Sequence, residues 1–103
     1  MYAFIVNPNS RSGLGLKIWG KLELILKERH IDYQIYFTRY PGHGAKLAAQ
    51  ICDTDADTLV VLGGDGTIGE VVGGIRDLTK LTLAYIPIGS GNDFARSMKL
   101  TKD

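Results

Sequence analysis

The sequence predicts an α/β domain built on a mainly parallel sheet with helices on both faces. Two observations support this fold class: four short apolar segments alternate with helical patterns of about ten residues, and small or polar loops follow three of those four segments. Such alternation is typical of βαβ units, in which each connecting helix covers the sheet. A length of 103 residues predicts a single domain over residues 1–103.

The strands are predicted by short runs of apolar and β-branched residues. Tyr2–Val6 is such a run and ends at the turn cluster of residues 7–10, while residues 58–62 form the continuous apolar run typical of a strand buried on both faces. Residues 31–38 alternate between the two sides of a strand, and residues 81–86 predict a fourth strand. In a parallel sheet, ligands bind at the carboxyl ends of the strands.

The helices are predicted over residues 16–29, 45–52 and 68–75, and a last one from Asp93 to Met98. Glycines at 69, 73 and 74 weaken the third helical pattern. Trp19 is expected in the core rather than in a lipid-binding stripe, and Cys52 is expected to be a buried small apolar residue. The first helix is predicted to place six apolar residues on one face: Leu16, Ile18, Trp19, Leu22, Ile25 and Leu26.

Composition and charge exclude several classes of protein. Residues 1–50 carry seven basic and three acidic side chains and residues 51–103 carry five and eight, so the net charge is +1, which argues against a general nucleic-acid binder. The single Cys52 excludes an internal disulfide and a cysteine-based zinc site, and it fits a reducing cytosol. No apolar run approaches the roughly 18 residues of a membrane helix. We therefore expect a cytoplasmic protein without a transmembrane segment.

The glycine-rich loop at residues 63–67, Gly-Gly-Asp-Gly-Thr, follows a predicted strand directly. Glycines let a ligand approach the backbone closely, and successive N–H groups at a helix start bind anions such as phosphate. A carboxylate beside a phosphate is repulsive unless it binds a metal, binds a donor group or handles a proton. Asp65 is therefore predicted either to act with Mg²⁺ or on an acceptor hydroxyl, or to cap the following helix, and the pattern leaves both readings open.

Two common nucleotide-binding patterns match only partly. Residues 64–69 fit G-x-G-x-x-G, but the next strand lacks the acidic residue of a dinucleotide site at its end. Gly15, Gly20 and Lys21 approach a phosphate-binding loop, but Leu22 stands where a hydroxyl should bind Mg²⁺, and the segment has a helical pattern. Neither pattern assigns a function.

Four segments in order resemble the diacylglycerol kinase catalytic domain family, which is shared with bacterial lipid kinases and, more loosely, with sphingosine kinases and NAD kinases. The first is Ile-Val-Asn-Pro-Asn-Ser at residues 5–10 with Gly13 and Gly15, and the second is Thr-Arg-Tyr-Pro-Gly-His-Gly at residues 38–44. The third is the glycine-rich loop with its continuation to Glu70, and the fourth is residues 86–96, which include Asn-Asp-Phe-Ala-Arg. Together they cover essentially the whole chain.

The resemblance implies a Rossmann-like three-layer domain of the NAD-kinase/diacylglycerol-kinase type. It also implies ATP- and Mg²⁺-dependent phosphorylation of a lipid hydroxyl, such as that of diacylglycerol, by an enzyme peripheral to the inner face of a membrane. Asp65 is the implied catalytic residue, and no residue of the chain is assigned as a metal ligand. The implied nucleotide contacts are Asn7, Ser10, Thr38, Gly64, Asp65, Gly66, Thr67, Ile68, Gly69, Glu70 and Ser90.

The chain also departs from the family. Gly69 and Gly73 stand where the family usually has Asn, Gly44 stands for Ala and Ser90 for Thr. The family's β-rich second domain, with its general base and magnesium carboxylates, has no counterpart here, so the chain looks truncated and is expected to be incomplete for catalysis alone.

Two alternatives stay open: a non-catalytic remnant or interaction module, and an NAD-kinase-like enzyme, over which residues 92–96 favour a lipid kinase. An incomplete sheet has an edge that can pair with a second copy, which allows a homo-oligomer. Arg39, Lys46 and His43 are further candidates for function.

Overall fold

The computed structural model describes residues 1–77 and 79–88 and contains seven elements in strict alternation. The predicted alternation of strand and helix is confirmed, while the predicted helix from Asp93 to Met98 lies outside the described residues. The elements are β1 (Tyr2–Val6), α1 (Leu14–Glu28), β2 (Tyr33–Phe37), α2 (His43–Cys52), β3 (Thr58–Gly63), α3 (Asp65–Gly74) and β4 (Thr82–Pro87).

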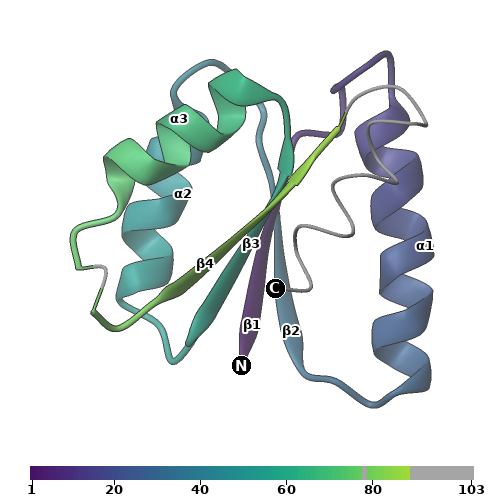
Figure 1. Ribbon diagram of the computed structural model, residues 1–103, viewed down its shortest axis with the longest axis horizontal. Coiled ribbons are helices and arrows are strands. Elements are labelled where there is room, and N and C mark those ends of the chain that lie inside the picture. Colours follow the sequence, from purple (N-terminus) through teal and green to yellow (C-terminus); the bar gives the residue numbers. More distant parts are fainter. Residues whose placement is uncertain (78, 89–103) are drawn as a thin grey trace.

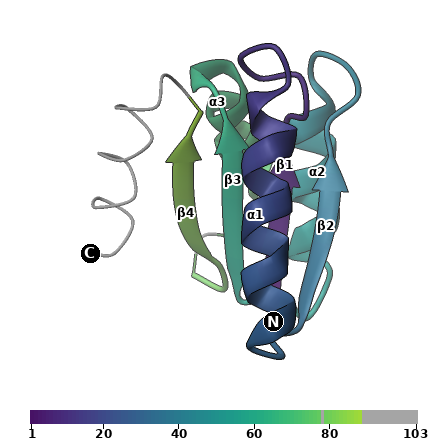
Figure 2. The ribbon, with the colours of Figure 1, turned by 90° about the vertical axis from the view of Figure 1, so that its right-hand side faces the viewer.

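The four strands form one parallel sheet in the order β2-β1-β3-β4. Helix α1 covers one face of the sheet, and α2 and α3 lie side by side over the other (Figure 1). The predicted three-layer α/β class is therefore confirmed. Because all strands run in the same direction, the loops after β1, β2 and β3 meet at one edge, which we call the carboxyl edge (Figure 2).

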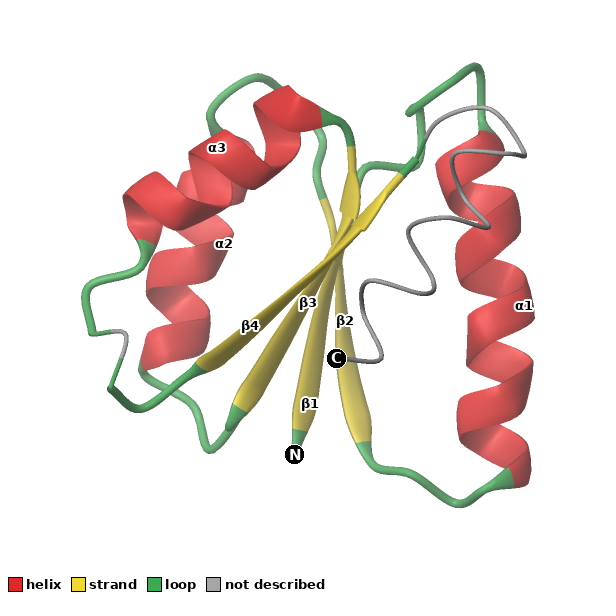
Figure 3. Cartoon of the chain, in the orientation of Figure 1, coloured by secondary structure: helices red, strands yellow, loops and turns green. Residues whose placement is uncertain are grey.

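Alternate residues of the central strands pack into two separate cores. Figure 3 shows the sheet lying between α1 on one side and α2 with α3 on the other. Ala3 and Ile5 of β1 point towards α2 and α3, whereas Phe4 and Val6 point towards α1. On the α1 side, the ring centroid of Trp19 lies 5.0 Å from that of Phe4. Both cores are fully apolar, which is the expected result for strands that are covered on both faces.

The buried face of helix α1 differs from the apolar face predicted for it. Ile18, Trp19 and Leu26 are buried as predicted, but Leu16 and Ile25 are 51% and 47% exposed. With 3.6 residues per turn, Leu16 lies about 100° around the helix from the centre of the buried set, and only one sheet packs against this helix. The apolar face is therefore narrower than the sequence predicts, since nothing in the described part of the chain covers its flanks.

Two further predictions need correction. Helix α3 begins at Asp65 rather than at residue 68, because packing of Thr67 and Val71 overrides the low helix propensity of its glycines. Cys52 is half-buried rather than buried, since it lies in the last turn of α2, where the chain turns towards β3.

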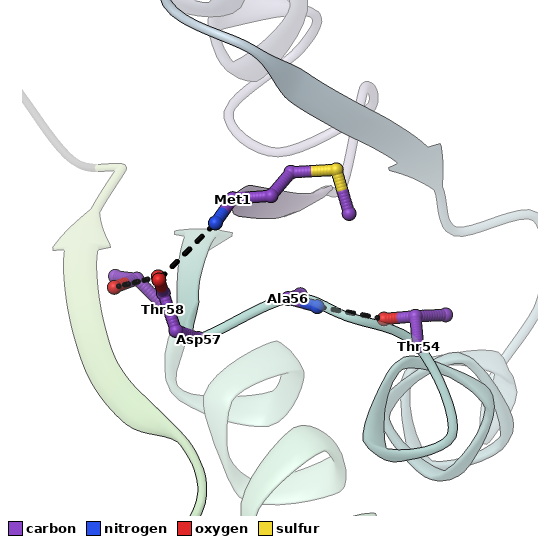
Figure 4. A network of polar contacts seen from close by, with 5 residues as sticks. All are labelled: Met1, Thr54, Ala56, Asp57 and Thr58. Atoms are coloured by element: carbon purple, nitrogen blue, oxygen red, sulfur yellow. Dashed lines mark hydrogen bonds and ion pairs between the residues drawn. The ribbon is translucent and has the colours of Figure 1, made fainter.

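Polar contacts close the amino edge of the sheet, at the end opposite the carboxyl edge (Figure 4). The ammonium group of Met1 pairs with the Asp57 carboxylate at 3.1 Å, and the Thr58 hydroxyl donates a hydrogen bond to the same carboxylate at 3.0 Å. These donors lower the pKa of Asp57, the Met1 hydrogen bond contributing most. Among the described helices, none is long and apolar enough to cross a membrane.

Candidate functional site

A cavity of ≈ 360 Å³ opens at the carboxyl edge, between the loops after β1 and β2 and the first turns of α3. Five of the residues implied by the resemblance line it together, although they come from three separate segments of the sequence. The full lining is Asn7, Asn9, Thr38, Arg39, Tyr40, Pro41, Gly66, Thr67 and Glu70.

The loop after β1 supplies Asn7, which the chain holds from both sides. Its side-chain oxygen accepts a hydrogen bond from the Asn9 N–H at 3.1 Å, which forms a tight local turn. Its amide nitrogen donates to the Thr67 hydroxyl at 3.4 Å and so links the loop to α3. A Cβ atom on Gly15 would collide with the Asn7 carbonyl, so only glycine lets α1 start this close to the loop. Ser10 is half-buried in the same loop but does not line the cavity.

The start of α3 presents the glycine-rich loop to solvent. Gly64 is the N-cap residue and Asp65 the first helical residue, with no side-chain capping bond, so the interpretation of Asp65 as the helix cap is wrong. Asp65 and Gly66 are exposed, and their N–H groups belong to the first turn, which has no intrahelical acceptors for them. Thr67 is buried against Gly63, where an added Cβ would lie 2.7 Å from its side chain. This end of α3 therefore has the features of an anion site.

Glu70 connects the two helices of one face. One carboxylate oxygen of Glu70 accepts a hydrogen bond from the Gly44 N–H, in the first turn of α2, at 3.2 Å. An added Cβ at Gly44 would lie 3.1 Å from that oxygen and 3.3 Å from the Glu70 Cβ. The glycine at position 44, where alanine is usual in the family, therefore makes room for this contact. Glu70 is half-buried and is not a solvated helix residue.

The loop after β2 forms the opposite wall. The Thr38 N–H donates to the Val6 carbonyl at 3.0 Å and extends the pairing of β1 with β2 by one residue. The Arg39 N–H donates to Nδ1 of His43 at 2.9 Å, and the His43 ring stacks on Tyr40 with centroids 4.4 Å apart. The Lys46 ammonium lies 5.4 Å from the centroid of the Tyr40 ring. His43 and Lys46 therefore fix the loop around Tyr40, and His43 Nδ1 is engaged as an acceptor there.

The remaining predicted residues lie outside the cavity lining. Gly64 and Asp65 directly precede the cavity-lining Gly66 in the chain, the Ile68 side chain packs against the core, and Gly69 is exposed on α3. Ser90 lies outside the described residues. Within residues 1–77 and 79–88, no group of three or more His, Cys, Asp or Glu side chains is placed to hold a metal ion.

Sequence reasoning missed several side chains near this site. Asn9, Tyr40 and Pro41 line the cavity, and their positions directly after predicted strands were the signal that could have found them. Tyr85 of β4 also reaches the site, with its hydroxyl 3.5 Å from a carboxylate oxygen of Asp65. No sequence motif marks Tyr85, because its proximity depends on the pairing of β4 with β3.

The fold is a Rossmann-like α/β domain with a cavity at the carboxyl edge of its parallel sheet. The family model of the diacylglycerol kinase catalytic domain matches residues 1–103. The chain therefore belongs to the diacylglycerol kinase catalytic domain family, the family that its motifs resemble.

Relatives and solved structures agree with this membership. The chain is 36% identical over 102 residues to YtlR of Bacillus subtilis (strain 168), to which lipid kinase activity is ascribed, with 96% of this chain and 33% of that protein covered. It is 32% identical over 100 residues to the diacylglycerol kinase of Staphylococcus saprophyticus, again with 96% and 33% covered. A solved diacylglycerol kinase structure from Bacillus anthracis str. Sterne matches with a TM-score of 0.68 and 29% identity, over 99% of this chain and 38% of that one. The chain thus spans about a third of the relatives it matches.

Proposed function

We propose that this chain is the nucleotide-binding part of a lipid kinase, which holds MgATP at the carboxyl edge and directs its γ-phosphate towards a lipid hydroxyl such as that of diacylglycerol. The observation that carries the proposal is the meeting of five implied residues in one cavity: Asn7, Thr38, Gly66, Thr67 and Glu70. Its volume of ≈ 360 Å³ lies in the range of small-molecule sites. Membership of a kinase family supports the same assignment.

The chemistry of the edge suits a triphosphate. The N–H groups of the first turn of α3 and the positive end of its dipole favour phosphate oxygens, and Gly64 and Gly66 leave the approach open. Phosphoryl transfer depends mainly on positioning and on neutralising charge, so backbone N–H groups can provide much of such a site.

The residues present offer a magnesium ion one exposed carboxylate. Mg²⁺ in phosphotransfer sites is bound by one or two carboxylates together with substrate phosphates and waters, and the exposed Asp65, one residue before the cavity-lining Gly66, supplies one such carboxylate. When bound, the ion neutralises phosphate charge. The chain spans about a third of the length of the first relatives it matches, so we propose nucleotide binding for this chain and assign no acceptor-binding residue to it.

Calorimetric titration of the 103-residue chain with MgATP tests the proposal. Gly64→Val and Asp65→Ala are each expected to weaken binding at least about tenfold, since the first blocks the approach of phosphate and the second removes the carboxylate. No heavy atom lies within 4 Å of a Cβ added at Gly64, so that variant is expected to fold. Gly20→Val is the matched control, because Gly20 is equally open but lies on the outer side of α1.

The outcomes separate the proposal from its rivals. Unchanged MgATP affinity in both Gly64→Val and Asp65→Ala would contradict the assigned site. A folded chain that binds no MgATP would favour the interaction module instead. Phosphorylation of NAD rather than of diacylglycerol would favour the NAD-kinase-like alternative.

A further inference from the structure

Tyr85 lies beside Asp65 at the carboxyl edge, outside every motif discussed above. It pairs with Val61 of β3 in the sheet register, and its partly buried ring packs against the core under α2 and α3. Its hydroxyl lies 3.4 Å from the Gly63 carbonyl oxygen and 3.5 Å from a carboxylate oxygen of Asp65. The edge strand β4 therefore carries a hydroxyl group to the first residue of α3.

The hydroxyl of Tyr85 has one proton and two acceptors within reach. It donates to one acceptor at a time, and an ionised carboxylate is a stronger acceptor than a peptide carbonyl. Both separations exceed the usual O–H···O range of roughly 2.5–3.0 Å, so a movement of about half an ångström completes a full hydrogen bond. The ring is held by packing, whereas the Asp65 side chain is exposed, so Asp65 is the group that moves.

The surroundings of Tyr85 keep its hydroxyl a donor. Burial of the ring, followed by the Asp65 charge, raises the pKa of Tyr85 above its ordinary value of 10.0. The phenol is therefore neutral and protonated at neutral pH. It can orient the carboxylate without a negative charge of its own, which would repel the Asp65 carboxylate.

We infer that Tyr85 is a positioning residue, whose hydroxyl holds the Asp65 carboxylate in the orientation that meets the cation-bound phosphates of the nucleotide. This inference rests on the proposed function and adds to it a residue from a different strand. Orienting an exposed side chain before binding reduces the entropy that binding must overcome. Tyr85 thus contributes to affinity without touching the ligand.

Removal of one oxygen atom tests this role. Tyr85→Phe keeps the ring and is expected to weaken MgATP binding by about three- to tenfold, in line with the net contribution of a typical hydrogen bond. Tyr36→Phe is the matched control. Tyr36 is also a strand tyrosine, but it lies in β2, the outer strand farthest from β4, and its hydroxyl donates a hydrogen bond to Gln34 at 2.8 Å. Tyr36→Phe is expected to leave the affinity unchanged, and both variants are expected to unfold at similar temperatures.

Two further measurements distinguish positioning from general structural damage. In the Asp65→Ala background, Tyr85→Phe is expected to have no further effect, and with ATP in the absence of Mg²⁺ its effect is expected to disappear. If Tyr85→Phe binds MgATP with wild-type affinity while Asp65→Ala binds it more weakly, the inference about Tyr85 is overturned and the proposed site stands. An equal loss with and without Asp65, or with and without Mg²⁺, would also overturn it. Unchanged affinity in Asp65→Ala would overturn the proposed site and this inference with it.

Discussion

The two faces of the sheet are packed in different ways. The α1 face uses one long helix and bulky rings, with Trp19 5.0 Å from Phe4 and 5.6 Å from Tyr33 between ring centroids. The opposite face uses two short helices whose backbones come so close that a Cβ on Gly74 would collide with the Ala45 backbone. One face thus relies on buried volume and the other on close backbone approach.

This difference explains where the cavity lies. Gly66, Thr67 and Glu70 come from α3, and Glu70 is bonded to the first turn of α2. The α1 face contributes to the cavity only through the loop after β1. We conclude that the α1 face supplies mainly stability, while the α2 and α3 face also determines the geometry of the site.

The largest expected effect comes from Trp19→Ala. Trp19 is 3% exposed, so truncation leaves a large cavity and is expected to lower the free energy of unfolding by about 3–5 kcal/mol, measured by urea denaturation. Leu24→Ala on the same helix is the control, since Leu24 is 63% exposed and its loss should be nearly neutral. MgATP affinity of the folded protein should be unchanged. A weaker MgATP affinity in Trp19→Ala than in Gly74→Ala would contradict the conclusion that the α2 and α3 face determines the geometry of the site.

Gly74→Ala is expected to have a smaller effect on stability but a larger one on the site. The added methyl group meets the Ala45 backbone, which cannot move aside as a side chain can, so α2 and α3 must separate. The expected loss is about 1–3 kcal/mol, which outweighs the gain in helix propensity. Separation also disturbs the bond between Glu70 and Gly44, so MgATP affinity should fall. Calorimetry and urea denaturation on one sample check both effects.

Gly69→Ala tests a glycine of α3 that does not face α2. Gly69 lies in the same helix as Gly74, but it is exposed and no heavy atom lies within 4 Å of an added Cβ. Alanine should therefore stabilise α3, by about 0.5–1 kcal/mol, seen as a higher urea midpoint. A destabilised Gly69→Ala would show that the intolerance of α3 is general rather than limited to its contact with α2.

The smallest expected effect is at the amino edge. The hydrogen bond from the Met1 ammonium, and then the one from Thr58, lower the pKa of Asp57 below its ordinary value of 3.8. A carboxylate with a lowered folded-state pKa adds stability that is present above about pH 4 and is lost as the pH falls through the folded-state value. Asp57→Asn should therefore slightly reduce the loss of unfolding free energy below about pH 4. The slope of the unfolding free energy against pH should stay unchanged near pH 7. A steeper acid loss in the variant would contradict this.

The sequence predicted the arrangement of the chain better than its contacts. Strand Tyr2–Val6 has its predicted bounds, because a continuous apolar run next to a turn cluster has few other solutions. The convergence of Asn7 and Thr38 with Gly66, Thr67 and Glu70 followed from motifs placed after parallel strands. The start of α3 was missed because glycine propensity favoured a loop, and tertiary packing overrode it.

Contacts between distant residues had no local signal. The Glu70–Gly44 bond depends on how α2 and α3 cross, and the approach of Tyr85 to Asp65 depends on the register of β4 against β3. Neither is a property of a short window of sequence. Tyr40 and His43 are close in the sequence, but the stacking of their rings depends on the turn geometry at the start of α2.

The strand order has a consequence for how the protein folds. β1 lies in the middle of the sheet, and one of its two neighbours is β3, so Asn7 meets Thr67 across a separation of 60 positions in the sequence. Contacts between such distant positions slow folding, because a long loop must close before they form. The cavity is complete only when the third strand has docked beside the first. During synthesis on the ribosome, the proposed ability to bind a nucleotide should therefore arise abruptly, only after β3 and α3 have been made, and it would report that the sheet has closed.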